Sequence, residues 1–262
     1  MNTMHSFVRR NPILVFALLA YLFSWWPAPF MGGRILSWGL IFSAWIILAI
    51  TEGKPGIRNW MQFITHWRAA WYWYLVGPGT IFFYTASAYV INILLGATVI
   101  HLPHFPDLTT LLTLLLVGGQ WEELGWSGYA LPALQERFTR HSNGALLAAL
   151  VVGSMRMIWH LPLVLSGNIA WFDMVFLSFA IQLIFAWLFN RTGGSIPIIM
   201  LAHFVSNLNG STYSGVFAGL EWTNYYVLFI AIALFTAFGI VWKSRRKLGQ
   251  KKLGSHPAAA NQ

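Results

Sequence analysis

Residues 111–131, LLTLLLVGGQWEELGWSGYAL, decide the fold, because they place two adjacent carboxylates inside an apolar run. Residues 111–117 are almost wholly apolar, and residues 129–131 resume that character after Glu122 and Glu123. A charged side chain at the centre of a bilayer costs at least about 2.5–3.5 kcal/mol. Two neighbouring carboxylates also repel each other. The pair therefore predicts a membrane protein in which other groups satisfy these acids, most simply at a functional site.

The composition supports a membrane protein throughout. The chain has 262 residues, of which 57% are hydrophobic and 9% charged, whereas a soluble domain carries about 25% charged residues. The mean hydropathy is +0.61. These values predict a single all-α membrane domain over residues 1–262. The chain has no cysteine, which excludes disulfides, thiolate zinc sites and a cysteine nucleophile.

Eight apolar segments predict a polytopic transmembrane helical bundle of about eight spans, because a span needs about 20 apolar residues. They are residues 12–31, 35–51, 71–99, 108–132, 144–165, 171–190, 194–210 and 222–242. Residues 54–70 mix aromatic and basic side chains, which is typical of a helix lying at the membrane interface.

The distribution of basic residues predicts the orientation. All Lys and Arg residues except Arg34 and Arg156, fourteen of the sixteen, fall on one side of the eight segments. The positive-inside rule then places both termini in the cytoplasm. Six of the sixteen lie in residues 243–252, where they predict contact with anionic lipid rather than nucleic acid. Short loops and the lack of an organelle signal predict a multi-pass protein of a bacterial cytoplasmic membrane.

Three of the predicted spans carry polar side chains to middle depths of the membrane. Two of them do so at a spacing of four residues, which puts both members of each pair on one helix face. A carboxylate can deprotonate water, while imidazoles and an amide can orient the water or stabilise an oxyanion. The residues are Glu122 and Glu123, Arg156 and His160, and His203 and Asn207.

Two other interpretations of these polar residues remain open. Imidazole and carboxylate are zinc ligands, so Glu122, His160 and His203 are candidate ligands for zinc. Each group also has a purely structural interpretation: histidine and asparagine can hydrogen-bond neighbouring helices, and Glu123 with Arg156 can form a structural ion pair.

The segments EELGWSGYALP (122–132), WHLP (159–162) and HFVSN (203–207) resemble three motifs of the CPBP intramembrane proteases. This family includes CAAX prenyl endopeptidases and the bacteriocin-processing or immunity proteins called Abi. Its motifs read EExxxR, FxxxH and HxxxN/D, in this order and on separate transmembrane helices. The resemblance covers residues 108–210, which would form the catalytic core.

The resemblance implies an intramembrane endopeptidase that uses glutamate-activated water on a membrane-associated or CAAX-type peptide or protein. Glu122 would activate the water and Glu123 would be a second, structural or assisting acid. His160 would support the oxyanion, and His203 and Asn207 would complete the site. Family members have been described both as metalloproteases and as glutamic proteases, so zinc is implied only in the first case. The expected partners are membrane lipids and a hydrophobic substrate.

Two positions depart from the motifs. The motif arginine would be residue 127, which is Ser127, and the motif aromatic would be residue 156, which is Arg156. Without a cation, an intramembrane carboxylate would be left uncompensated. We therefore predict that Arg156 reaches from its own span to neutralise Glu123.

Two functions of other classes are compatible with the sequence. A catalytically degenerate relative would act as a non-enzymatic membrane scaffold or immunity protein, with Ser127 as the sign of its degeneracy. A small transporter would use the carboxylates as a proton relay. A transporter of this kind predicts an internal repeat, and none is evident in the sequence.

Overall fold

The computed structural model describes residues 3–249, which form helices and no strand. In chain order the helices are α1 (Thr3–Arg10), α2 (Pro12–Trp25), α3 (Gly39–Thr51), α4 (Gly53–Ile64), α5 (Trp73–Leu94), α6 (Leu108–Val117), η1 (Gly119–Glu122), α7 (Glu123–Gly125), η2 (Trp126–Ala130), α8 (Leu131–Arg137), α9 (Gly144–Trp159), α10 (Leu161–Leu165), η3 (Asp173–Leu177), α11 (Ser178–Arg191), α12 (Ile196–Thr212) and α13 (Gly219–Lys243). Lys251 and Lys252 of the basic tail lie outside the described residues.

Four helical segments within residues 3–249 are long and apolar enough to cross a membrane: Trp73–Leu94, Gly144–Leu165, Asp173–Arg191 and Gly219–Lys243. The regular structure of residues 3–249 is thus all-helical and includes helices that can span a membrane. α2 and α3 are apolar but shorter. The predicted first span, 12–31, is wrong at its end, because Pro27 and Pro29 follow Trp25 and proline cannot continue a helix without loss of a hydrogen bond.

The sequence predicts one span over 108–132, but in the structure the segment that carries the two glutamates is not a continuous helix. α6 ends at Val117, and Gly118 is extended, with φ −67° and ψ 169°. The chain then forms a 3-10 turn, η1, a single α turn, α7, and a π-helical turn, η2, before α8 begins. Short 3-10 and π turns inside a helix often mark functional sites. The break puts Glu122 and Glu123 on irregular, buried backbone.

The break is held by side chains rather than by the helix itself. Gln120 Nε2 donates to the carbonyl oxygens of Leu114 and Leu115, at 2.7 and 2.9 Å. Trp121 Nε1 also donates to Leu115 O, at 3.0 Å. These donors satisfy carbonyls that a helix end leaves without partners. In a bilayer such satisfaction is required, because no water reaches the backbone there.

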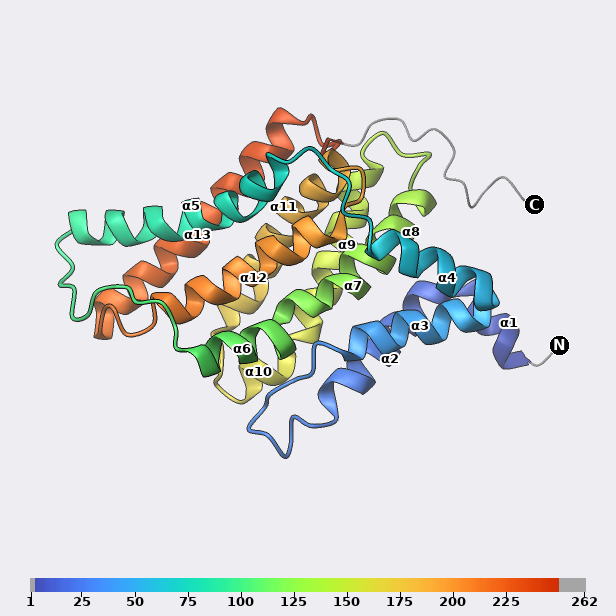
Figure 1. The fold of residues 1–262 in the computed structure, drawn as a ribbon, viewed down its shortest axis with the longest axis horizontal. Helices are drawn as coiled ribbons and strands as arrows, with labels where there is room; N and C mark the ends of the chain where they lie inside the picture. Colours follow the sequence, from blue (N-terminus) through green and yellow to red (C-terminus); the bar gives the residue numbers. More distant parts are fainter. Residues whose placement is uncertain (1–2, 250–262) are drawn as a thin grey trace.

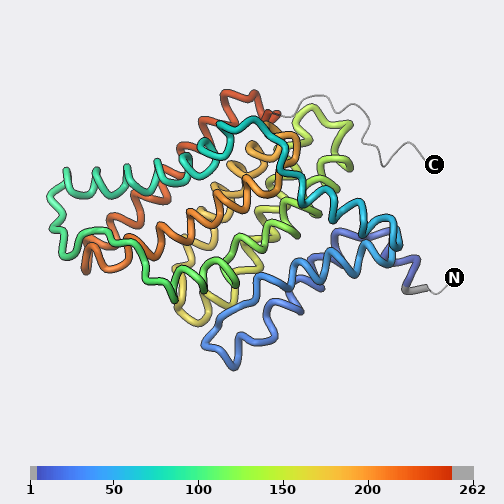
Figure 2. Tube along the Cα trace, in the orientation of Figure 1, coloured from blue at the N-terminus to red at the C-terminus, as the bar shows by residue number. Residues whose placement is uncertain are grey.

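The helices fall into two groups with the broken segment between them (Figures 1 and 2). On one side, α2 packs on α3, and α3 also contacts α4 and α7. On the other side, α5 packs on α12 and α13, while α11 contacts α9, α12 and α13. A hydrophobic cluster extends from Val8 to Leu248 through both groups. The glutamates therefore lie where α7, α9 and α12 meet in the interior.

The outer surface is apolar, as expected for side chains that face lipid. On α2, Leu14, Leu18 and Leu22 are exposed, and on α13, Phe235 and Phe238 are exposed. The interior by contrast carries small residues and the polar group described below. This arrangement is typical of membrane bundles, in which small residues let helices approach closely.

The predicted interfacial helix over 54–70 is shorter in the structure, because α4 ends at Ile64. It buries Trp60 and Ile64 and exposes Lys54 and Arg58. Trp60 Nε1 donates to Gly128 O, at 3.1 Å. α4 is therefore amphipathic and is fixed directly to the π turn that follows the glutamates.

Candidate functional site

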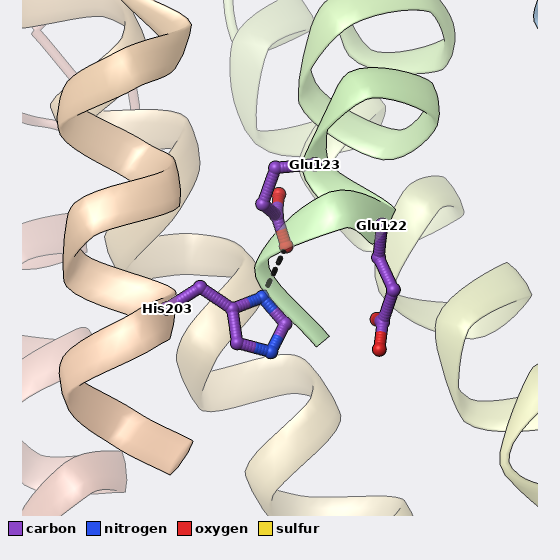
Figure 3. A group of neighbouring side chains, drawn as sticks. All are labelled: Glu122, Glu123 and His203. Atoms are coloured by element: carbon purple, nitrogen blue, oxygen red, sulfur yellow. Dashed lines mark hydrogen bonds and ion pairs between the residues drawn. The ribbon is translucent and has the colours of Figure 1, made fainter. Parts of the chain in front are cut away.

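The fold brings the predicted polar residues from three elements into one buried group. Glu122 ends η1 and Glu123 begins α7, while Arg156 lies in the last turn of α9. His203 lies on α12, and its imidazole points toward Glu123. Figure 3 shows this hydrogen bond, with the Glu122 carboxylate beside the ring and no bond drawn to it.

Glu123 is completely buried and accepts three hydrogen bonds. Arg156 Nη2 and His203 Nδ1 both donate to Oε1, at 2.7 and 2.8 Å. Ser127 Oγ donates to Oε2, at 2.6 Å. Ser127 thus gives Glu123 a donor at the position where the motif has arginine. A carboxylate with this many donors is stabilised in its ionised form, so Glu123 is suited to hold its neighbours in place.

Arg156 joins both glutamates. Besides its contact with Glu123, which charge balance predicted, its Nη1 lies 3.1 Å from Glu122 Oε2. Its Nε donates to Gln182 Oε1, at 3.3 Å. The guanidinium also lies 5.8 Å from the centre of the Trp126 ring. The side chain is only 2% exposed, so these partners take the place of water.

The side chains of Glu122 and His203 close tightly over Gly119. A Cβ added at Gly119 would lie 2.9 Å from Glu122 Oε1 and 2.6 Å from His203 Nε2. Position 119 therefore has no room for a side chain, and both atoms lie close to it. A carboxylate oxygen and an imidazole nitrogen that approach the same point are near enough to bond one water molecule.

The hydrogen bonds of the two histidines assign their tautomers. His203 Nδ1 contacts a carboxylate, and His160 Nδ1 lies 2.9 Å from Arg156 O. Both acceptors lack a hydrogen, so each Nδ1 carries one. In the neutral ring, Nε2 then presents a lone pair. Each neutral imidazole can accept a hydrogen bond from water at Nε2, and it can donate there only after protonation.

Asn207 is oriented by Gln120, a residue that the sequence analysis did not identify. Asn207 Nδ2 donates to Gln120 Oε1, at 3.4 Å. Because Gln120 Nε2 donates to two backbone carbonyls, its Oε1 must point the other way, toward Asn207. One N–H of Asn207 is used in this bond and the second stays available. The signal in the sequence that could have identified Gln120 is its polar side chain within an apolar run, two positions before Glu122.

The donor set does not fit a catalytic zinc ion. Among the described residues, Glu122, Glu123 and His203 bring ligand atoms within 4.8 Å of one another, and His160 is not in this group. Arg156 already places its positive charge on both glutamates. Glu123 and His203 Nδ1 are bonded to each other. Catalytic zinc takes three protein ligands, whereas Glu122 Oε1 and His203 Nε2 are the atoms that remain beside Gly119.

A cavity of about 170 Å³ opens beside the group. Its walls include the functional side chains of α9 and α12, and the rest of the lining comes mainly from α10, η3 and α11. The lining residues are Arg156, His160, Leu163, Ile169, Asp173, Met174, Leu177, Ser178, Ile181, His203, Ser206 and Asn207. Asp173 is a residue of this cavity that the sequence analysis did not identify.

Comparison with known proteins identifies the segment that carries the site. Residues 103–209 match the family model described as Type II CAAX prenyl endopeptidase Rce1-like. A protein of Methanococcus maripaludis named CAAX prenyl protease 2 is 32% identical over 114 residues. That match covers 39% of this chain and 40% of the relative, so the chain spans about two fifths of the length of that relative. The family-model match contains every polar residue of the site from Glu122 to Asn207.

Proposed function

We propose that this chain, whose residues 103–209 match the Rce1-like model of Type II CAAX prenyl endopeptidases, hydrolyses a peptide bond within the membrane. The substrate class is a membrane-associated or CAAX-type peptide or protein. The observation that carries the proposal is the close approach of Glu122 Oε1 and His203 Nε2 to one point over Gly119. A water molecule bonded to both atoms would meet a base, while the hydrogen bonds of Glu123 and Arg156 hold the rest of the network in place.

Glu122 is the proposed general base. Arg156 holds its Oε2, which leaves Oε1 to take a proton from water as the oxygen attacks the scissile carbonyl carbon. The resulting tetrahedral intermediate carries its negative charge on the former carbonyl oxygen. Glu122 then returns the proton to the leaving nitrogen as the C–N bond breaks. The products are a new carboxylate and a new amine.

The remaining residues have supporting roles in this proposal. The free N–H of Asn207 supplies a hydrogen bond to the oxyanion. His160, through its Nε2 lone pair, orients the water in the resting enzyme and supports the oxyanion only once protonated. Glu123 orients His203, as a carboxylate does in other catalytic histidine pairs. The cavity of about 170 Å³ beside these groups receives part of the substrate.

The departures at Ser127 and Arg156 support an active protein over a degenerate scaffold. If they had disabled the site, Glu123 would lack a cation. Instead Arg156 and Ser127 together give it the partners that the motif arginine would supply. We therefore propose that Ser127 and Arg156 preserve the ion pair of Glu123, with the arginine supplied by α9 instead of by position 127. In this proposal the site works without a metal ion.

The proposal is tested by cleavage of quenched fluorescent peptides by the purified protein in lipid. The library contains hydrophobic and CAAX-like sequences, and each is assayed with and without a chelator. We expect cleavage that a chelator leaves unchanged, because the donor set does not fit zinc. Cleavage abolished by chelator and restored by zinc would refute the metal-free mechanism. Absence of cleavage across the library would favour the scaffold function.

Gly119→Ala is expected to lower the cleavage rate about 10²-fold, since small displacements at a reacting centre cost that much. The added Cβ would fall 2.6 Å from His203 Nε2 and 2.9 Å from Glu122 Oε1, which is closer than van der Waals contact, so it would displace the two groups that are proposed to bond the water. The measurement is the single-turnover rate. Gly210→Ala is the matched control, because a Cβ there meets nothing within 4 Å. Equal rates for the two variants would contradict the position of the water.

We also propose eight membrane crossings with both termini in the cytoplasm of a bacterium. The support is the charge distribution, with Arg34 as the one basic residue expected on the outer side. The apolar outer faces of α2 and α13 agree with contact to lipid. Labelling of single introduced cysteines from either side of a sealed vesicle measures the orientation, and the chain offers a background with no native cysteine.

A further inference from the structure

Asp173 is a buried carboxylate beside the catalytic group with no cation of its own. It begins η3, is 8% exposed and lines the same cavity as Arg156 and His203. Tyr226 OH donates a hydrogen bond to its Oδ2. The ion pairs between described residues all involve Glu122 or Glu123, so none of them neutralises Asp173.

One hydrogen bond does not satisfy an intramembrane carboxylate. An ionised carboxylate offers about four acceptor positions, and Tyr226 fills one of them. Acidic residues within membrane segments are rare and mark substrate or ion pathways. A purely structural contact between α13 and η3 would be met by a neutral residue at lower cost. The retained acid therefore points to a ligand that supplies further donors.

The charges around the cavity favour a cation. Among the residues that line the cavity, Asp173 is the one carboxylate and Arg156 the one guanidinium. The charge of Arg156 is already engaged by Glu122 and Glu123, so the Asp173 carboxylate is the charge on the walls that no ion pair neutralises. Charge interactions are stronger in a low-dielectric interior than in water. A positively charged group entering this space is attracted, and an anionic one is repelled.

The remainder of the cavity suits the stem of a long basic side chain. Leu163, Ile169, Met174 and Leu177 provide apolar walls in the cavity that Asp173 also lines. The volume of about 170 Å³ is similar to that of a cavity that holds one benzene ring, about 150 Å³. Lysine and arginine pack their methylene stems on apolar surface and extend the charge beyond it. The cavity therefore matches one side chain of this kind.

We propose that Asp173 forms a specificity subsite that binds a lysine or arginine side chain of the peptide substrate. Tyr226 holds the carboxylate in position, and the apolar walls contact the stem. The inference rests on the proposed peptidase function, because a specificity subsite serves a substrate that is cleaved. Binding at the subsite, however, does not require cleavage. The two can therefore be tested separately.

The test is a binding measurement in the Glu122→Gln background, in lipid nanodiscs, with fluorescent hydrophobic peptides. At each position in turn, lysine is compared with norleucine, which has a similar stem and no charge. We expect lysine at one position to bind about tenfold more tightly, the effect of one good charged contact. Asp173→Asn should bring the two peptides to equal affinity. If the protein that keeps Asp173 binds the lysine and norleucine peptides equally at every position, or binds neither measurably, the inference is overturned.

Two further variants separate the subsite from general effects. Tyr226→Phe removes the hydrogen bond but keeps the acid, so the preference for lysine should persist. Glu221→Gln removes an acid that bonds the Thr98 backbone N–H and lies outside the cavity, so it should change nothing. A lysine preference that survives Asp173→Asn, or that Glu221→Gln abolishes, would also overturn the subsite. Lysine-selective binding by a protein that cleaves no peptide would support the subsite and refute the peptidase function.

Discussion

Glu122→Gln is expected to lower peptide cleavage about 10²–10⁴-fold, the usual contribution of a general base. Glutamine keeps the shape of the side chain but cannot take a proton from water. Its amide can still lie beside Arg156, which now contacts Glu122 Oε2 at 3.1 Å. We therefore expect the protein to insert and fold with nearly unchanged stability. The measurement is the single-turnover rate at saturating enzyme, compared with the midpoint of unfolding.

Glu136→Gln is the matched control, because Glu136 is an exposed glutamate in α8, outside the site. Its rate should equal that of the unmodified protein. Glu123→Gln differs in kind, since Glu123 is bonded to Arg156, His203 and Ser127. It should lose stability together with rate. Full cleavage by Glu122→Gln would show that another group activates the water.

Arg156→Met is expected to lower the free energy of unfolding by about 3–5 kcal/mol, the cost of removing one partner of a buried ion pair. Methionine keeps most of the volume between the Trp126 and Phe185 rings. It leaves Glu122 and Glu123 without a cation in an interior that excludes water. Chemical denaturation in micelles, followed by tryptophan fluorescence, measures the loss.

A double substitution tests whether the position of the arginine has been exchanged. Arg156→Phe together with Ser127→Arg restores the motif pattern and returns a cation to the residue four positions after Glu123. We expect the double variant to be more stable than Arg156→Phe alone, because the new arginine can occupy the vacated volume.

If Arg156→Met keeps its stability and cleavage rate, the ion pair has no structural role. If Ser127→Arg gives no rescue, the exchange is refuted.

Local patterns in the sequence determined which residues could act together. A spacing of four residues puts Arg156 near His160 and His203 near Asn207 on their helices, whatever the neighbouring helices do. Charge balance was enough to pair Arg156 with Glu123, because no other basic residue lies within a predicted span. The apolar composition likewise determined a helical membrane protein, since the bilayer admits few other structures.

The helix boundaries were less predictable, because they depend on contacts that hydropathy does not record. Hydropathy runs without interruption through residues 111–117 and predicts a helix that continues. The break at Gly118 exists because Gln120 and Trp121 satisfy the carbonyls of the α6 terminus. Only the folded chain shows that those side chains turn back onto the helix.

Contacts between helices were decided by the tertiary structure alone. Arg156 reaches Glu122 as well as Glu123, Gln120 orients Asn207, and Asp173 lines the cavity beside these residues. None of these follows from periodicity, because each depends on the rotation and depth of one helix against another. The sequence by itself determined the membrane class and the polar residues of the site. Packing decided which atoms of those residues are bonded, and which remain free to meet a water molecule or a substrate.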